Sequence, residues 1–260
     1  MHGSMDDQLI REFAEKLEYL RGLDKRRDEI RSLIDAQEKL TDEINLALDK
    51  AATLSELEDI YRPYRPKRKT RASIAKEKGL EPLANDILKQ EKGFDPSKSA
   101  VDYIDEEKGV TSVEDAIQGA MDIIAELVSD NAEIRKRIRN LTNANGVLVS
   151  VATDEEKDSV YKNYYDYKEP VKKIAGHRVL AVNRGEKEGF LKVSVETDSE
   201  KPLNSIFRAM ITDKNQLCSD IIREACTDAY QRLIYPSIER EVRNDLTDCL
   251  LYTSDAADEE

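Results

Sequence analysis

The chain has 260 residues, 37% of them charged, and a formal net charge of −13; it contains three cysteines and two histidines. This length allows one large or two modest domains with a substantial core. So few cysteines and histidines argue against a zinc site, and we predict no cofactor. The absence of Trp, with only ten Gly and seven Pro, favours a helical protein over a sandwich or a disulfide-rich secreted fold. The sequence shows no signal peptide and no apolar run approaching about 18 residues, so we expect a cytoplasmic protein without membrane association.

Apolar residues at helical spacing dominate the first 60 residues. The spacing predicts one helix from Asp6 to Leu20 and, because Gly22 weakens the helix, a second from Asp24. The inner face of the second helix is predicted to carry Ile30, Leu33 and Ile34.

Two further helix starts carry capping residues. Thr41 is placed to cap a third helix, and Thr53–Glu56 has the pattern of a capping box, in which Glu56 reaches back to the cap residue. The short helix that follows Thr53 must stop before Pro63.

The segment Tyr61–Ala72, called the basic segment below, differs from the acidic chain around it. Pro63 and Pro66 favour an extended backbone in the residues before them, so no helix can continue through the segment. From Arg62 to Lys78 there are eight basic residues and one acid, a local balance of +7 that leaves −20 on the remainder of the chain. The eight are Arg62, Arg65, Lys67, Arg68, Lys69, Arg71, Lys76 and Lys78.

A stiff cationic connector with aromatic neighbours is typical of a surface that contacts phosphate, because cations there release counterions from a nucleic acid. The residues predicted to contact phosphates are Arg62, Arg65, Lys67, Arg68, Lys69 and Arg71, with Tyr61 or Tyr64 able to stack on a base. The alternative is that the prolines form only a helix-to-helix elbow and that the basic run pairs with acids of its own chain.

Helical patterning resumes after the basic segment. Thr70 is predicted to cap a helix that ends at Gly79, and Pro82 suits the first turn of the next helix. Short helices joined by tight turns predict a helix-turn-helix-like arrangement. This resemblance does not by itself identify a recognition helix that enters the major groove.

The middle of the chain continues in helices. Ser112 is a further cap, followed by the clearest amphipathic stripe of the sequence, from Val113 to Val128. A helix from Asp130 to Leu141 is predicted with its apolar residues inside, and the second basic cluster is interpreted as a solvated face. That cluster comprises Arg135, Lys136, Arg137 and Arg139.

A small β-ribbon is predicted from two β-branched runs, Val147–Val151 and Phe190–Val195. A helix from His177 should precede the second run, and a long helix from about Leu217 should end before Pro236, with another from Ser237 to Leu246. The tyrosines Tyr161, Tyr164, Tyr165 and Tyr167 could stack on bases, but their spacing favours core packing.

No set of residues predicts an enzyme. His177, beside Arg178, could contact a phosphate or transfer a proton, but no nucleophile or carboxylate partner can be assigned to it, which favours a structural role. The acidic clusters lie in polar loops, where no apolar surroundings would shift their pKa values. Cys218 and Cys226, eight apart in one helical pattern, are expected to pack as small apolar groups. We therefore expect no catalytic activity.

The basic segment also carries a family resemblance. With its continuation Ser73–Ala84, it closely resembles the bacterial transcription accessory protein Tex family. Other motifs follow the family's order along the chain: Glu18–Arg21, Tyr164–Tyr167, His177–Arg178, Arg184–Gly189 and Pro236–Glu241. Ordered matches over nearly the whole chain are more specific than any one motif.

The resemblance implies a role in transcription for an amino-terminal helical part of a longer protein. Family members continue with an RNase H-like domain, helix-hairpin-helix elements and an OB-fold RNA-binding domain, and this chain stops about where the first of these should begin. Within it we predict a mainly α fold with a helix-turn-helix-like region at 1–92, a helical scaffold with the β-ribbon at 93–248, and a disordered tail at 249–260 that resembles translated adapter sequence.

Two functions are therefore expected as alternatives. In the first, the basic segment contacts RNA or DNA during transcription. In the second, the chain is a scaffold or interaction module that supports the downstream domains or meets a partner associated with RNA polymerase, and nucleic-acid binding resides in the absent domains.

Overall fold

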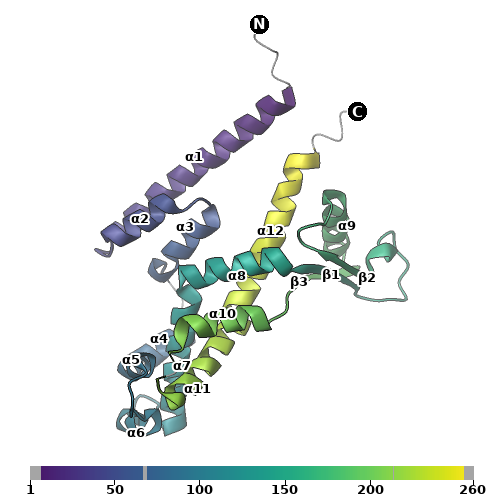
Figure 1. Cartoon of the computed structure of the whole chain (residues 1–260). Coiled ribbons are helices and arrows are strands. Elements are labelled where there is room, and N and C mark those ends of the chain that lie inside the picture. Colours follow the sequence, from purple (N-terminus) through teal and green to yellow (C-terminus); the bar gives the residue numbers. More distant parts are fainter. Residues whose placement is uncertain (1–6, 67–68, 213, 255–260) are drawn as a thin grey trace. The chain divides into compact units, whose positions relative to one another are not determined.

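The structure is a computed structural model that describes residues 7–66, 69–212 and 214–254. It is mainly α-helical with one small antiparallel sheet, as predicted (Figure 1). Its internal contacts define two compact units. The first comprises the residues up to Tyr64, Thr142–Thr197 and the residues from Glu239; the second comprises Arg65–Leu141 and Asp198–Ile238.

The first unit begins with three helices, α1 (Asp7–Asp35), α2 (Asp42–Lys50) and α3 (Leu54–Tyr61), followed by the 3₁₀ turn η1 (Arg62–Tyr64). The predicted break near Gly22 is wrong, because α1 is continuous. A single glycine costs only about 1 kcal/mol in a helix interior, which the packing of the flanking turns outweighs.

These three helices share a core of Leu23, Ile30, Ile34, Leu48, Ala51, Leu57 and Tyr61. The assignment of Leu33 to the inner face is wrong, since 42% of its surface is exposed. Thr41 and Thr53 cap α2 and α3 as predicted. Glu56 reaches one residue further than expected and accepts the amide N–H of Ala52 at 2.7 Å.

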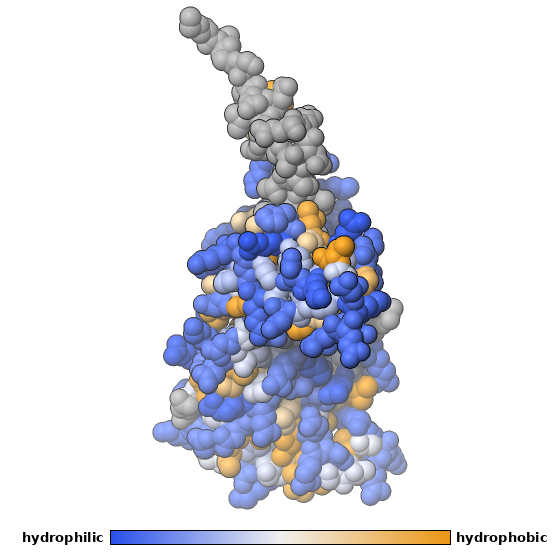
Figure 2. Space-filling view, turned by 90° about the vertical axis from the view of Figure 1, so that its right-hand side faces the viewer, coloured by the Kyte–Doolittle hydropathy of each residue, from blue (hydrophilic) through white to orange (hydrophobic). Residues whose placement is uncertain are grey.

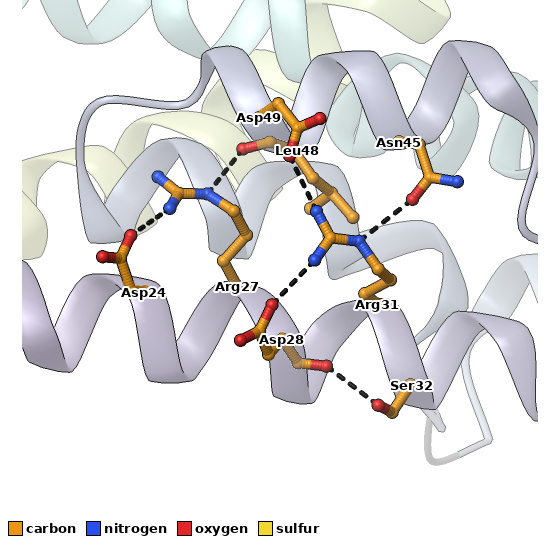
Figure 3. A network of polar contacts seen from close by, with 8 residues as sticks. All are labelled: Asp24, Arg27, Asp28, Arg31, Ser32, Asn45, Leu48 and Asp49. Atoms are coloured by element: carbon orange, nitrogen blue, oxygen red, sulfur yellow. Dashed lines mark hydrogen bonds and ion pairs between the residues drawn. The ribbon is translucent and has the colours of Figure 1, made fainter.

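Arginines of α1 tie it to the end of α2 (Figure 3). Arg27 donates to the carbonyl of Leu48 at 2.9 Å and to that of Ala51 at 3.0 Å, so it satisfies carbonyls that the helix end leaves without partners. Arg31 donates to Asn45 at 3.1 Å and to Asp49 at 2.7 Å. These guanidinium groups fix the α1–α2 hairpin rather than remaining available for a ligand.

The sheet of the first unit has three strands, β1 (Val147–Ala152), β2 (Asp166–Pro170) and β3 (Leu191–Glu196), in the order β2-β1-β3. The predicted pairing of the first and last strands is confirmed, with Val149 opposite Ser194. The prediction of two strands is incomplete, because β2 pairs along the other side of β1, with Lys168 opposite Val149.

Helix α9 (Gly176–Lys187) packs against this sheet, and the tyrosine cluster completes their core. Tyr161 is buried with Val182 and Leu191, and its ring centroid lies 5.8 Å from that of Phe190. Tyr164, Tyr165 and Tyr167 pack half-buried around it, the first as part of the 3₁₀ turn η3 (Lys162–Tyr164). The preference for core packing over base stacking is therefore confirmed.

The second unit is built around α7 (Val113–Asp130), whose buried face includes Ile123, Ile124 and Val128. Ser112 caps α7, Thr70 caps α4, and Gly79 ends α4 with φ at 85°, all as predicted. The elements packed with α7 include α4 (Arg71–Glu77), α5 (Glu81–Lys89), α6 (Pro96–Ala100), η2 (Val101–Tyr103) and α11 (Gln216–Asp228). Helix α10 (Glu200–Met210) packs against α11.

The orientation of α8 (Ala132–Asn145) was only partly predicted. Ile134 and Ile138 are buried, as expected, but so are two residues of the cluster interpreted as a solvated face: Arg135 is 1% and Arg139 7% exposed. Arg135 donates to the hydroxyl of Ser237 at 3.1 Å. Burying a guanidinium costs solvation free energy, which polar partners on other elements offset. Such partners cannot be recognised from the local sequence pattern.

The helix predicted to end before Pro236 does not end there. It continues from α11 through the π-helix η4 (Ala229–Ile234) into α12 (Tyr235–Ser254). Proline would clash with the carbonyl four residues earlier in a regular α-helix, and the wider π turn relieves that clash. The last residues, 255–260, lie outside the described part of the chain.

Cys218 and Cys226 are free thiols buried in α11, so their predicted role as small apolar groups is confirmed. Burial raises the pKa of Cys226 to about 12, so its sulfur stays protonated at neutral pH.

Candidate nucleic-acid interface

The aromatic start of the basic segment is anchored in the first unit. Tyr61 is the last residue of α3 and only 6% exposed, and the guanidinium carbon of Arg26 lies 5.7 Å from its ring centroid. The suggestion that Tyr61 stacks on a base is therefore wrong, because its ring belongs to the protein core.

Tyr64 and Arg62 are half-buried in η1. Tyr64 packs against the same core cluster, and its carbonyl accepts the side-chain amide of Gln37 at 2.9 Å. This contact fixes the backbone at the point where the chain leaves the first unit, which ends at Tyr64.

The exposed cations begin directly after this point, in the second unit. Arg65, Lys69 and Arg71 are exposed, whereas Lys67 and Arg68 lie outside the described residues. Thr70 and Ser73 form a reciprocal capping box, in which the N–H of Ser73 donates to the Thr70 hydroxyl at 3.0 Å and the N–H of Thr70 to the Ser73 hydroxyl at 2.8 Å. The capping box fixes the start of α4 between Lys69 and Arg71.

Carboxylates of the second unit lie near two of its lysines. The ammonium of Lys69 is 3.4 Å from Glu77, and both side chains are about two-thirds exposed. Further along α4, Lys76 pairs with Glu81 at 3.1 Å, also at the surface. Internal pairing, the alternative weighed for the basic run, is thus realised in part.

Arg71 faces the carboxyl of Asp122 on α7. Burial raises the pKa of Asp122, while the charges of Arg71 and Arg232 act in the opposite direction and favour its ionised form. Arg232 lies 3.9 Å from Asp122 and also pairs with Asp228, whose side chain is more exposed than that of Asp122. Arg71 is therefore electrostatically engaged on one side, although its side chain remains exposed to solvent.

The other candidate cation, Arg178, is bound within the first unit. Its guanidinium donates to both carboxyl oxygens of Glu169, at 2.9 and 3.0 Å, and to the hydroxyl of Tyr167 at 3.4 Å. The hydrogen bond from Tyr167 and the charge of Arg178 lower the pKa of Glu169. Neighbouring His177 is exposed at the start of α9.

The surface view is in keeping with the high charge. The face drawn in Figure 2 is predominantly hydrophilic, with hydrophobic residues in small groups. Within the described residues, no group of three or more His, Cys, Asp or Glu side chains could bind a metal ion. No described helix is both long and apolar enough to cross a membrane.

The fold is that of a mainly α protein in which a small antiparallel sheet accompanies the helices. The Tex central region-like family matches residues 91–249, more than half of the chain. The chain therefore belongs to the Tex family.

Named relatives extend the match towards the amino terminus. The chain is 43% identical over 95% of its length to the uncharacterized protein YdcI of Bacillus subtilis. It is 36% identical over 75% of its length to the transcriptional accessory protein Tex of Neisseria gonorrhoeae, and 27% identical over 94% to the human S1 RNA-binding domain-containing protein 1. It spans 35%, 26% and 26% of the lengths of these three proteins, so it corresponds to about a third or a quarter of each relative.

Proposed function

We propose that this chain contributes a nucleic-acid contact to transcription, in which Arg65, Lys69 and Arg71, together with Lys67 and Arg68, bind phosphates. The observation that carries the proposal is that Arg65, Lys69 and Arg71 of the cationic run are exposed, in a chain whose net charge is −13. The names of two relatives, a transcriptional accessory protein and an S1 RNA-binding domain-containing protein, support the same process.

The internal ion pair at Lys69 does not prevent this role. Exposed pairs such as Lys69–Glu77 contribute at most about 1 kcal/mol and are screened by salt. A phosphodiester can therefore replace Glu77 at little cost, and counterion release from the nucleic acid adds a gain that a carboxylate does not offer.

The proposed contact is non-catalytic, and it does not depend on sequence. Arginine and lysine at a phosphate backbone set position and affinity rather than base preference. A role at transcribed nucleic acid implies a cytoplasmic location. The helix-turn-helix-like interpretation of α4 and α5 stays a prediction, because phosphate contacts beside α4 do not require that either helix enter a groove.

The experiment is a salt titration of binding to fluorescent single- and double-stranded RNA and DNA. With three to five phosphate contacts, the logarithm of the affinity should fall with the logarithm of salt with a slope of about −2 to −3.5 for a single strand. The triple reversal Arg65→Glu, Lys67→Glu and Arg68→Glu should abolish binding at moderate salt.

A charge-matched control separates a local contact from the effect of net charge. Lys168→Glu, Lys172→Glu and Lys173→Glu reverse three exposed lysines in the sheet region of the first unit and also change the charge by six units, from −13 to −19. The proposal expects the control to retain most of the binding. Equal losses in both triple variants, or a binding curve indifferent to salt, would refute it.

The alternative function is a scaffold or interaction module, and the surroundings of Arg71 favour it. If Arg71 serves mainly to balance the half-buried Asp122, then Arg71→Gln should lower thermal stability and leave any nucleic-acid affinity unchanged. If the phosphate contact is its main role, the same variant should weaken binding. The slope of log affinity against log salt should then fall by the contribution of about one phosphate contact.

A further inference from the structure

The amino-terminal half of α1 carries large apolar side chains that solvent reaches. Ile10 is 47% exposed, Phe13 66%, Leu17 37% and Leu20 44%. Their spacing of three, four and three residues places them along one side of the helix, and we call them the apolar stripe. Neither the basic segment nor the proposed nucleic-acid contact accounts for this surface.

The stripe belongs to a part of α1 that its own hairpin partners leave uncovered. Further along the helix, Leu23, Ile30 and Ile34 are buried beneath α2 and α3. Arg27 bonds the carbonyls of Leu48 and Ala51 at the end of α2, and the whole apolar stripe lies before Arg27 along α1. Four large apolar side chains in succession are more than the isolated exposed leucine that a monomer surface normally carries.

Two cations flank the middle of the apolar stripe. In a heptad that places the stripe at the a and d positions, Lys16 falls at g and Arg21 at e, and both are exposed. Glu15 and Glu18 lie on the opposite side of the helix. Between Phe13 and Leu20 the apolar stripe therefore has one cation on each side, and Glu15 and Glu18 face away from it.

We propose that the apolar stripe is the docking surface for an amphipathic helix of another protein, with aliphatic residues on its seam and acidic residues beside them. Aliphatic side chains at i, i+3, i+4 and i+7 would pack between Phe13, Leu17 and Leu20. Glutamates at the partner's flanking positions would pair with Lys16 and Arg21.

A second copy of this chain is the less suitable occupant. In a parallel pair, Lys16 of one helix would face Arg21 of the other; in an antiparallel pair, each would face its own equivalent. Both arrangements bring like charges together beside the seam, which disfavours self-association and leaves the surface for an acidic partner.

The test uses two synthetic helical peptides of about 21 residues that share leucines at every a and d position. One carries Glu at all e and g positions and the other carries Lys there. Fluorescence anisotropy with the 260-residue chain should show the Glu-flanked peptide binding at least about tenfold more tightly. Equal affinity for both peptides would overturn the proposal, because it would show only non-specific apolar adhesion.

Two sets of variants complete the test. Phe13→Ser with Leu17→Ser should weaken binding of the Glu-flanked peptide at least about tenfold, whereas Leu46→Ser, at a residue of α2 that is 54% exposed, should not. Lys16→Glu with Arg21→Glu should reverse the preference between the peptides. Retained binding in the first pair, or an unchanged preference in the second, would refute the proposal.

Sedimentation equilibrium addresses the second copy directly. The wild-type chain should be monomeric at micromolar concentrations. A wild-type dimer that Phe13→Ser with Leu17→Ser dissociates would overturn the proposal in favour of self-association through the apolar stripe. Circular dichroism of each variant checks that α1 remains helical, which is expected because the exchanged side chains are exposed.

Discussion

At the scale of single residues, two motifs of the family resemblance act on the open edge of the sheet. Glu186 accepts the amide of Val193 at 3.3 Å, and Glu239 accepts that of Val195 at 3.1 Å. Arg243 donates to the carbonyl of Val193 at 3.1 Å and pairs with Glu186. Side chains of α9 and α12 thus satisfy the edge of β3, which would otherwise offer unpaired backbone groups to another strand.

Glu186→Ala should destabilise the first unit by about 1–3 kcal/mol, because it removes the acceptor of a strand amide and the partner of a partly buried arginine. Hydrogen exchange should show the amide of Val193 losing protection. Glu196→Ala, at an exposed position at the end of the same strand, is the control and should leave both quantities nearly unchanged. Undiminished protection in Glu186→Ala would contradict this role.

The group of Tyr167, Glu169 and Arg178 gives a pH dependence. The pKa of Glu169 is lowered below its ordinary value of 4.5, first by the hydrogen bond from Tyr167 and then by Arg178. An acid whose pKa is lower in the folded state stabilises that state above its unfolded pKa, and this gain is lost as the pH falls through the folded value. Glu169→Gln should therefore lower Tm by a few degrees at neutral pH and have no effect in strong acid.

An NMR titration checks the cause of that shift. Tyr167→Phe removes the principal hydrogen bond, so the pKa of Glu169 should rise towards its ordinary value while the ion pair with Arg178 persists. An identical pKa in wild type and Tyr167→Phe would show that the hydroxyl is not responsible.

At the scale of elements, the contact between α9 and β3 depends on a glycine. A Cβ at Gly185 would lie 2.5 Å from Leu191 Cδ1 and 3.0 Å from Tyr161 Cγ, so helix and strand approach as closely as the missing side chain permits. Gly22 in α1 is the opposite case, because a Cβ there would meet nothing within 4 Å. The same residue type thus has a packing role in one helix and none in the other.

The two glycines therefore predict opposite effects of one substitution. Gly185→Ala should destabilise the first unit by about 1–3 kcal/mol through overpacking. Gly22→Ala should stabilise it by about 0.5–1 kcal/mol, since alanine is the better helix former. Chemical denaturation of both variants measures the difference, and destabilisation by Gly22→Ala would show that α1 requires a glycine at that point.

Local chemistry made some elements predictable and left others unpredicted. The capped starts at Thr41, Thr53, Thr70 and Ser112 were predictable because a cap involves residues three apart in the sequence. Strand β2 was not, since Asp166–Pro170 is a polar edge strand whose pairing with β1 depends on distant residues. The helix across Pro236 was missed because a π turn has no pattern of its own.

The candidate interface was likewise only partly predictable from the sequence. The cationic run can be read directly from the residues, and the structure leaves Arg65, Lys69 and Arg71 exposed within it. That these side chains contact phosphates stays a prediction. The sequence pattern could not assign Tyr61 and Tyr64 to the core, because Tyr61 ends α3 and Tyr64 lies in η1, where tertiary contacts decide their burial. The proximity of Asp122 to Arg71 was equally beyond prediction, since 51 positions of sequence separate them.

At the scale of the whole molecule, both compact units are assembled from segments distant in sequence. The first draws on three segments and the second on two, with α4 and α5 packed against α7 in the second. The sequence-based division at residue 92 stays a prediction about domains, but it separates α4 and α5 from the helix that covers them. Contacts of this range cannot be inferred from periodicity, which reports only which face of each element is buried.

A fragment of residues 1–92 should therefore fold only in part. We expect the α1–α3 cluster to remain ordered, because its core is made within residues 23–61, and α4 and α5 to lose their fixed structure. Heteronuclear NMR of the fragment should show dispersed amide signals from α2 and α3 and collapsed signals from residues 71–89. Uniform dispersion throughout would contradict this expectation.

The order of these segments along the chain has a consequence for biosynthesis. A ribosome releases every residue of the second unit once Ile238 has emerged, whereas the first unit gains its last segment only from Glu239 onwards. The unit that is begun first is thus finished last. Until then, β3 lacks Glu239 and Arg243 along its outer edge, the side on which an edge strand can pair with a strand of a neighbouring chain.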